Sequence, residues 1–239
     1  MCMTVIKIKE RRTDYQITEA FRTIRTNLRF CGRDKKVIAV TSCIPNEGKS
    51  SVSVLLAQAL REEGARVVLV DADLRKSVMF QHFFVEGEGA GLSDYLSGQS
   101  SMKDVMHSTD MENFDIIMSG ISPPNPTELL RTQEFTKMLG NLREMYDYIL
   151  VDTPPIGLVI DAAVIAEACD GILWVVSSGQ ISRQMANVTM RQLEKSGCPV
   201  LGAVLNKVDM KRSGQNTYYS GGYYRQYGDH CIAAENIQN

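Results

Sequence analysis

The segment that most constrains this chain is Ser42–Ser51, with the sequence SCIPNEGKSS, which separates an apolar run at Val37–Val40 from an amphipathic segment. This order predicts a strand, a tight loop and a helix. The free N–H groups of the helix start would face the loop, Lys49 would reach the β- and γ-phosphates of a nucleotide, and the Ser50 hydroxyl would ligate Mg²⁺. The segment therefore predicts a phosphate-binding loop (P-loop).

The match to the pattern G-x-x-x-x-G-K-[ST] is incomplete. Cys43 stands where the first glycine of the pattern falls, and only Gly48–Ser50 is intact. A helix that begins with G-K-S and binds no phosphate is the alternative interpretation of this segment taken alone. The acids found further along the chain favour the nucleotide.

Length, charge and cysteine content exclude several classes of protein. A chain of 239 residues suits one large α/β domain with tails, and a net charge of −2 argues against nucleic acid as a direct partner. The six cysteines are scattered without a C-x-x-C pair, so we expect reduced thiols in a cytosol and neither a zinc site nor a disulfide framework. No apolar run approaches the ~18 residues that span a bilayer. We therefore expect a cytoplasmic protein that a partner recruits to the membrane.

Acidic residues follow two of the apolar runs. Asp71 and Asp73 come at the end of the run that starts at Arg66, and Asp152 ends the run Tyr148–Val151. Open parallel sheets bind ligands at this edge, and grouped carboxylates are costly without a cation, so Mg²⁺ is expected here. Asp152 fits the position of a Walker B acid. For the first pair, a strand-end turn with a helix-capping Asp is the alternative.

Apolar strands and helical segments alternate along the chain. We expect strands at 37–40, 66–71, 114–118, 148–152, 171–176 and 200–205, and helices at 18–30, 51–64, 125–145, from 161 onward and at 183–196. This alternation favours an α/β fold with a mostly parallel β-sheet flanked by helices on both faces, of the P-loop NTPase (Rossmann-like) type.

The sequence predicts a specific contact for each of two asparagines. Asn125 is the expected N-cap of a helix, with Pro126 at the first helical position and Glu128 reaching back to the cap. Asn206 ends the last strand, where its amide would contact a purine, although asparagine is also a common turn residue.

Beyond Met210 the sequence becomes polar, rich in glycine and without period. This part holds five of the nine tyrosines, namely Tyr218, Tyr219, Tyr223, Tyr224 and Tyr227. Because it cannot build a core, we expect a flexible tail. The predicted division is an N-terminal segment with an oligomerisation helix at 1–36, a P-loop domain at 37–210 and the tyrosine-rich tail at 211–239.

Four features occur in an order typical of one family: the GKS at 48–50, the DADLR at 71–75, the VDTPP at 151–155 and the tyrosine tail. In these the chain resembles the bacterial protein-tyrosine kinases of the P-loop type. It is most similar to the free-standing cytoplasmic form of Gram-positive bacteria, which works beside a separate membrane activator in capsule or exopolysaccharide production. The resemblance covers the chain from Glu19 to Tyr227.

The resemblance implies a role for each matching residue. Lys49, Asp71, Asp73 and Asp152 would be catalytic, and Ser50 with the three acids would bind Mg²⁺. ATP would be bound by Pro45, Asn46, Glu47, Gly48, Lys49, Ser50, Ser51 and Asn206. The five tail tyrosines would be phosphorylated. Glu19, Arg22 and Arg25 match the family's E-x-x-R-x-x-R motif, which implies a ring-like homo-oligomer; by charge pattern alone they would be an ordinary solvated helix face.

Two positions depart from the family. Asn46 replaces a usual glycine of the P-loop, and Ser77 replaces a usual proline. Asparagine tolerates a left-handed backbone, so we expect Asn46 to keep the loop shape at some cost in strain.

The sequence thus predicts a tyrosine autokinase that transfers the γ-phosphoryl group of ATP to the tail of a neighbouring subunit. Its expected partners are a membrane activator of the polysaccharide co-polymerase type, a cognate phosphatase and tyrosine-bearing substrates. One alternative is a partitioning or septum-positioning ATPase, although the signature lysine of that class is absent between Ser42 and Gly48. A second alternative is a nucleotide-gated scaffold of a polysaccharide export complex.

Overall fold

The computed structural model describes residues 5–9, 14–84 and 89–209 of the chain. The described residues up to Asn206 form one compact unit, and a second unit begins at Lys207. Every helix and strand described below belongs to the first unit. The tail tyrosines lie outside the described residues.

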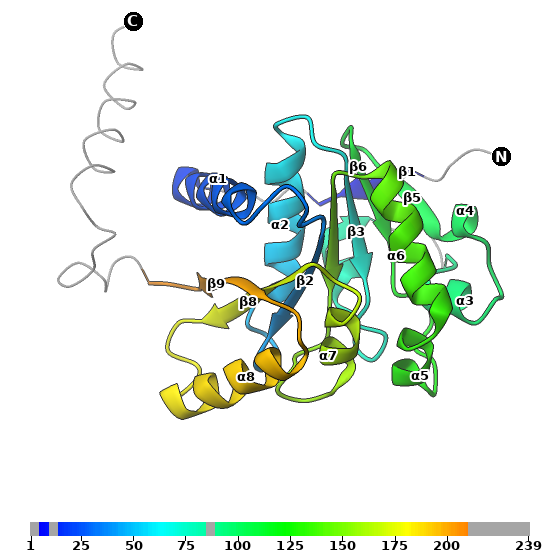
Figure 1. Ribbon diagram of the computed structural model, residues 1–239. Coiled ribbons are helices and arrows are strands. Elements are labelled where there is room, and N and C mark those ends of the chain that lie inside the picture. The colour runs from blue at the N-terminus through cyan, green and yellow to red at the C-terminus, as the bar shows by residue number, and fades with distance from the viewer. Residues whose placement is uncertain (1–4, 10–13, 85–88, 210–239) are drawn as a thin grey trace, which may run out of the picture. The chain divides into compact units, whose positions relative to one another are not determined.

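A nine-stranded sheet forms the centre of the first unit (Figure 1). The strand order is β4-β1-β5-β6-β3-β7-β2-β8-β9. Its strands are β1 (Val5–Ile8), β2 (Val37–Ser42), β3 (Val67–Asp71), β4 (Phe83–Phe84), β5 (Met106–Thr109), β6 (Phe114–Ile117), β7 (Tyr148–Asp152), β8 (Gly171–Ser177) and β9 (Val200–Asn206). Only the β1–β4 and β5–β6 pairs of this sheet are antiparallel. The predicted mostly parallel sheet is confirmed.

Helices cover both faces of the sheet. They are α1 (Tyr15–Phe30), α2 (Lys49–Arg61), α3 (Leu92–Leu96), α4 (Met102–Val105), α5 (Pro126–Leu130), α6 (Gln133–Met145), α7 (Asp161–Ala166) and α8 (Arg183–Lys195), with the short 3₁₀-helix η1 (Met79–His82). Apolar residues of α1 and α2 pack on Ile38 and Val40 of β2, while Val37 and Ala39 face the cores that α6, α7 and α8 cover. All six residues of β2 are therefore buried, as in sheets covered on both sides.

The N-terminal part of the chain joins the same core. Ile6 and Ile8 of β1 and Leu28 of α1 are buried in one cluster with residues of α2. Phe21 and Ile24 pack against this cluster, so the predicted apolar face of α1 is confirmed. Within the described residues, no helix combines the length and the apolar character that crossing a membrane requires.

The helix predicted at 125–145 is wrong in one respect, because the chain forms two helices there. Thr132 has an extended backbone, and its hydroxyl donates a hydrogen bond of 2.7 Å to the Leu129 carbonyl, which ends α5 before α6 begins. Pro126 does occupy the start of α5, as predicted. The predicted capping contact differs in detail: the Asn125 amide donates to the Glu128 carboxylate at 2.9 Å, and Asn125 makes no side-chain cap.

Three strands at one side of the sheet were not predicted from the sequence. β1, β4 and β5 are only two to four residues long, and β1 and β5 contain polar residues, as in the MHST of β5, so all three lack the long apolar runs on which the strand prediction relied. β4 pairs with β1, β1 pairs with β5 on its other side, and β5 pairs with β6. Long-range pairing, rather than local pattern, defines these strands.

Candidate active site

The P-loop and the three predicted acids converge at the carboxyl edge of the sheet. β2 lies beside β7, and β7 lies beside β3, so the loop that follows β2 is next to the ends of both acid-bearing strands. Asp71 and Asp152 are direct partners in the register of β3 and β7, and Val40 of β2 is the partner of Asp152 on the other side. Parallel strand order thus joins residues that are distant in sequence at one place.

The backbone of the loop is left-handed at two positions. Asn46 has φ +64° and Gly48 has φ +90°. The predicted left-handed conformation of Asn46 is therefore confirmed. At Gly48 a Cβ would lie 2.3 Å from the Asn206 side-chain nitrogen, so a side chain there would displace that amide in addition to straining the left-handed backbone. Pro45 and Asn46 are exposed at the loop surface, whereas Lys49 and Ser50 are buried.

Lys49 lies among the acids. Its Nζ is 3.3 Å from Asp152 Oδ2, 3.4 Å from Asp73 Oδ2 and 3.3 Å from Ser50 Oγ. Burial lowers the pKa of Lys49, but attraction to Asp152, Asp73 and Asp71 outweighs it, so the pKa lies above its ordinary value. Lys49 is thus a fully charged cation that partly neutralises three buried carboxylates.

Asp71 is the most deeply buried of these acids, with none of its surface exposed. Burial, helped by the nearby Asp152 carboxylate, raises the pKa of Asp71 to about 7. A hydrogen bond from the Ser77 hydroxyl to Asp71 Oδ2 and the charge of Lys49 act in the opposite direction. Ser77, which replaces the usual proline of the family, therefore makes a contact that a proline cannot make.

Asp152 is held by two serine hydroxyls of α2. Ser50 Oγ donates to Asp152 Oδ2 at 2.6 Å, and Ser53 Oγ donates to Asp152 Oδ1 at 2.9 Å. Ser53 is not among the site residues that were predicted from the sequence. Its position three residues after Ser50 on the predicted helix was the signal, since residues at that spacing share a helix face.

Replacing Ser53 with Ala should weaken the use of Mg²⁺. Ser53 is completely buried, and its loss leaves Asp152 Oδ1 without the donor that orients the carboxylate. Residues that orient metal ligands typically contribute 10- to 100-fold in affinity, so we expect the Mg²⁺ concentration for half-maximal phosphoryl transfer to rise about tenfold. Transfer assays over a Mg²⁺ series measure this. The control is Ser97→Ala, which removes an exposed hydroxyl bonded to backbone carbonyls; equal curves for the two variants would contradict the prediction.

A second polar network fixes the segment that follows Asp73. The Arg75 guanidinium contacts both carboxylate oxygens of Asp161, at 2.6 and 3.1 Å. Thr127 donates to the same carboxylate at 2.6 Å and accepts a hydrogen bond from Arg75 at 2.9 Å. Burial raises the pKa of Asp161, but these contacts outweigh it and hold the pKa below its ordinary value. The network links the DADLR segment to the starts of α5 and α7.

The oxygen donors of the site fit Mg²⁺ in combination with a phosphate. Among the described residues, no three His, Cys, Asp or Glu side chains are arranged to hold a metal ion by themselves. Mg²⁺ commonly takes one or two protein ligands and completes its octahedron with phosphate oxygens and water. Ser50 and Asp152, whose oxygens are 2.6 Å apart, offer such a pair of ligands.

Other predicted contact residues have partners of their own. The Asn206 amide nitrogen donates to the Glu47 carbonyl at 2.8 Å, so in this structure one of its N–H groups holds the P-loop. The second N–H and the amide oxygen are the groups that the predicted purine contact would use. The Ser51 hydroxyl lies 3.5 Å from His82 Nε2 in η1. The Glu47 carboxylate is turned inward and is almost completely buried.

The three residues of the E-x-x-R-x-x-R motif do not form one exposed face. Glu19 and Arg22 pair with each other at the surface of α1. Arg25 instead packs on α2, where it donates to the Ala59 carbonyl at 2.8 Å and pairs with Glu63 at 2.7 Å. Within one chain, Arg25 therefore links α1 to α2.

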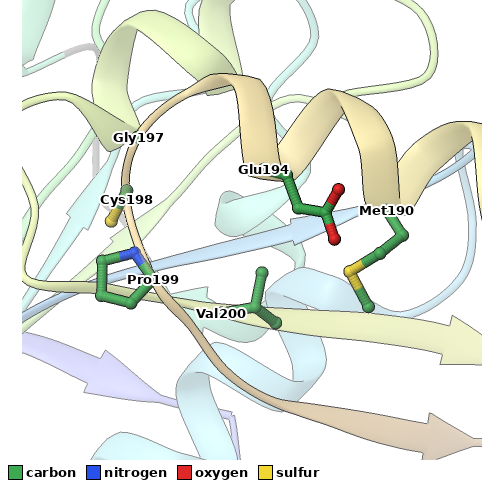
Figure 2. A pocket seen from close by; sticks show the side chains of 6 residues that line it. All are labelled: Met190, Glu194, Gly197, Cys198, Pro199 and Val200. Atoms are coloured by element: carbon green, nitrogen blue, oxygen red, sulfur yellow. The ribbon is translucent and has the colours of Figure 1, made fainter.

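A surface hollow of about 400 Å³ lies away from the site. Figure 2 shows its lining at the end of α8 and the start of β9, formed by Met190, Glu194, Gly197, Cys198, Pro199 and Val200. Because the P-loop follows the end of a parallel strand and this hollow precedes the start of one, the two lie at opposite edges of the sheet.

Comparisons with known proteins agree with this geometry. Residues 35–195 match the family described as AAA domain. The tyrosine-protein kinase CpsD of Streptococcus agalactiae serotype III (strain NEM316) is 44% identical over 191 residues, which cover 80% of this chain and 82% of that protein. The kinase domain of the Escherichia coli tyrosine kinase ETK has a TM-score of 0.78 at 30% identity, covering 90% and 94% of the two chains. The septum site-determining protein MinD of Pyrococcus horikoshii OT3, complexed with Mg-ADP, has a TM-score of 0.61 at 26% identity, covering 73% and 71%.

Proposed function

Since this chain belongs to the AAA-domain family and, within it, to the bacterial tyrosine-protein kinases, we propose that it transfers the γ-phosphoryl group of ATP to the C-terminal tyrosines of a neighbouring copy of the chain. The observation that carries the proposal is the buried cluster of Lys49, Asp73 and Asp152 beside the P-loop. Phosphoryl transfer requires mainly positioning and neutralisation of charge, and this cluster supplies charged groups of both signs in one buried place.

The P-loop and Lys49 would bind the phosphates. Backbone N–H groups of residues 46–50 would face the phosphates at the start of α2, where the helix dipole also favours an anion. Lys49 would exchange its contacts with Asp73 and Asp152 for the β- and γ-phosphate oxygens. Ser50 and Asp152 would hold Mg²⁺, which when bound neutralises charge on the β- and γ-phosphates.

The paired acids Asp71 and Asp73 would receive the proton of the attacking tyrosine. A free tyrosine has a pKa near 10, so a carboxylate close to the hydroxyl must take its proton as the O–P bond forms. Asp73 is 5% exposed and Asp71 is fully covered. The Asp71 carboxylate accepts the Asp73 N–H at 3.3 Å, a contact by which each acid fixes the position of the other.

The acceptor would be the tail of a neighbouring subunit. Tyr218, Tyr219, Tyr223, Tyr224 and Tyr227 are close together in sequence. By contrast, the described Tyr146 is buried and donates its hydroxyl to Asp115 at 2.6 Å, so it is no candidate acceptor. We further propose a ring-like oligomer, recruitment to the membrane by an activator, a cognate phosphatase and a role in capsule or exopolysaccharide synthesis. The similarity to the tyrosine-protein kinases CpsD of Streptococcus supports the tyrosine-kinase part of this proposal.

Two variants together test transfer between chains. A Lys49→Met chain keeps the tail and serves as acceptor, and a chain with Phe at the five tail tyrosines keeps the site and serves as donor. When both are mixed with Mg²⁺ and ATP, intact-mass analysis should find phosphate on the acceptor alone. Each variant incubated by itself is the control and should stay unmodified. Phosphate in wild-type protein together with none in the mixture would contradict transfer between chains.

The same experiment separates the kinase from a MinD-type ATPase. ATP hydrolysis by wild-type protein without phosphate on any tyrosine would favour the ATPase, and the absence of both reactions would favour a nucleotide-gated scaffold. The higher TM-score to the ETK kinase domain than to MinD supports the kinase.

A further inference from the structure

The Glu47 side chain has a role that its place in the P-loop does not by itself explain. Glu47 lies between the two left-handed residues Asn46 and Gly48, and its carboxylate is turned inward below the loop. Only 1% of the residue is exposed. A buried carboxylate near a triphosphate site would repel the ligand unless its charge were locally balanced.

Three backbone N–H groups balance that charge. Glu47 Oε2 accepts hydrogen bonds from Cys43 at 2.7 Å and Ile44 at 2.9 Å, and Oε1 accepts one from Ser177 at 2.9 Å. Within the described residues, Glu47 forms no ion pair. A carboxylate accepts hydrogen bonds and donates none, so it suits a site in which three N–H groups point at its two oxygens.

The same residue connects the loop to the edge of the sheet. Ser177 ends β8 and Asn206 ends β9, and the two are register partners. Ser177 bonds the Glu47 carboxylate, while the Asn206 amide bonds the Glu47 carbonyl at 2.8 Å. Glu47 therefore joins the loop start to the ends of both strands.

We propose that Glu47 is a positioning residue for nucleotide binding, which holds the P-loop in its curved shape before a phosphate arrives. The turn after β2 has Cys43 where the P-loop pattern has its first glycine, and the bonds to Cys43 and Ile44 hold this turn. A loop that is already ordered loses less conformational freedom on binding, and this favours affinity for the nucleotide. The inference rests on the proposed function only in taking the P-loop as the nucleotide site.

Glu47→Gln tests the proposal with almost no change of shape. A glutamine amide has one accepting oxygen and one donating NH₂ group, so at least one of the three N–H groups would face another donor. Leaving a buried donor without an acceptor costs free energy that is equivalent to a factor of about 5 to 100 in a binding constant. We expect the KM for ATP to rise by that factor while kcat changes less than about threefold. The matched control is Glu134→Gln, which changes an exposed acid paired with Lys137 on α6.

Binding of Mg-ADP is measured in parallel, because it does not require tyrosine transfer. Trp174 is the only tryptophan of the chain and lies three residues before Ser177 in β8, so its fluorescence can follow the titration. Weaker Mg-ADP binding by Glu47→Gln supports the inference even if no tyrosine is phosphorylated, in which case only the proposed function fails. Unchanged KM and unchanged ADP affinity would overturn the inference. If Glu47→Gln does not fold, Asn206→Ser removes the bond to the Glu47 carbonyl and should raise the KM in the same direction; an unchanged KM there would also overturn it.

Discussion

Replacing Lys49 with Met is expected to lower tyrosine phosphorylation at least about 100-fold. The variant lacks the cation that would stabilise charge on the transferred phosphoryl group, and removing one such preorganised group typically costs 10²- to 10³-fold in rate. Lys49 is also the cation that contacts both Asp73 and Asp152 in the described structure. Intact-mass analysis after incubation with Mg²⁺ and ATP measures the loss.

The same variant has a second expected effect, on stability. Without Lys49, the carboxylates of Asp71, Asp73 and Asp152 remain buried with no neutralising partner, which is strongly destabilising. We therefore expect a lower Tm in EDTA and a larger rise of Tm on adding Mg²⁺ than for wild-type protein. Lys137→Met, which removes an exposed cation on α6, is the control and should change neither property. Near-normal phosphorylation by Lys49→Met would contradict the assignment of this loop as the phosphate site.

Replacing Asp71 with Asn should change both activity and the pH dependence of stability. Loss of a general base or its partner typically costs 10²- to 10⁴-fold in rate. For stability, the pKa of Asp71 is about 7 in the folded chain and near 3.9 in an unfolded chain. The folded state therefore binds the proton more tightly, so this residue makes wild-type protein less stable as pH rises from about 4 to about 7.

Asp71→Asn lacks this dependence, because its amide does not titrate. The free energy of unfolding of the variant minus that of wild type should therefore be larger at pH 8 than at pH 5. The expected increase is on the order of a few kcal/mol, or about 5 °C or more in Tm. Thermal unfolding at pH 5, 6, 7 and 8 in EDTA measures this difference. Asp34→Asn, at an exposed acid, should run parallel to wild type across the series. A parallel curve for Asp71→Asn as well would show that Asp71 is ionised at pH 5 in the folded chain.

The central strands and the loop could be predicted because their signals are local. Val37–Val40 and Tyr148–Val151 are continuous apolar runs, which suit strands covered on both faces. Asn46 was expected to be left-handed because its own side chain tolerates that backbone, and φ is +64°. Such features depend on residues that are neighbours in sequence.

Contacts between distant segments could not be predicted in the same way. The bond from Ser53 to Asp152 joins residues 99 positions apart, and the bond from Ser177 to Glu47 spans 130 positions. Arg25 shows the same limit, because its charge pattern suggested a solvated helix face whereas the structure packs its side chain on α2. The role in oligomerisation that the family resemblance implies stays a prediction. Nothing in the local sequence names these partners.

The sequence by itself determined the P-loop, the acids that follow two strands and the alternation of strands and helices, since each follows from side-chain chemistry and spacing along the chain. The tertiary structure decided which groups surround each charge. The strand order β3-β7-β2-β8-β9 brings Asp71, Asp152, Glu47 and Asn206 to one edge. Helices on both faces bury the polar groups of this edge, where a lost hydrogen bond or an unpaired charge is costly, so each group depends on the partners that this strand order brings to it.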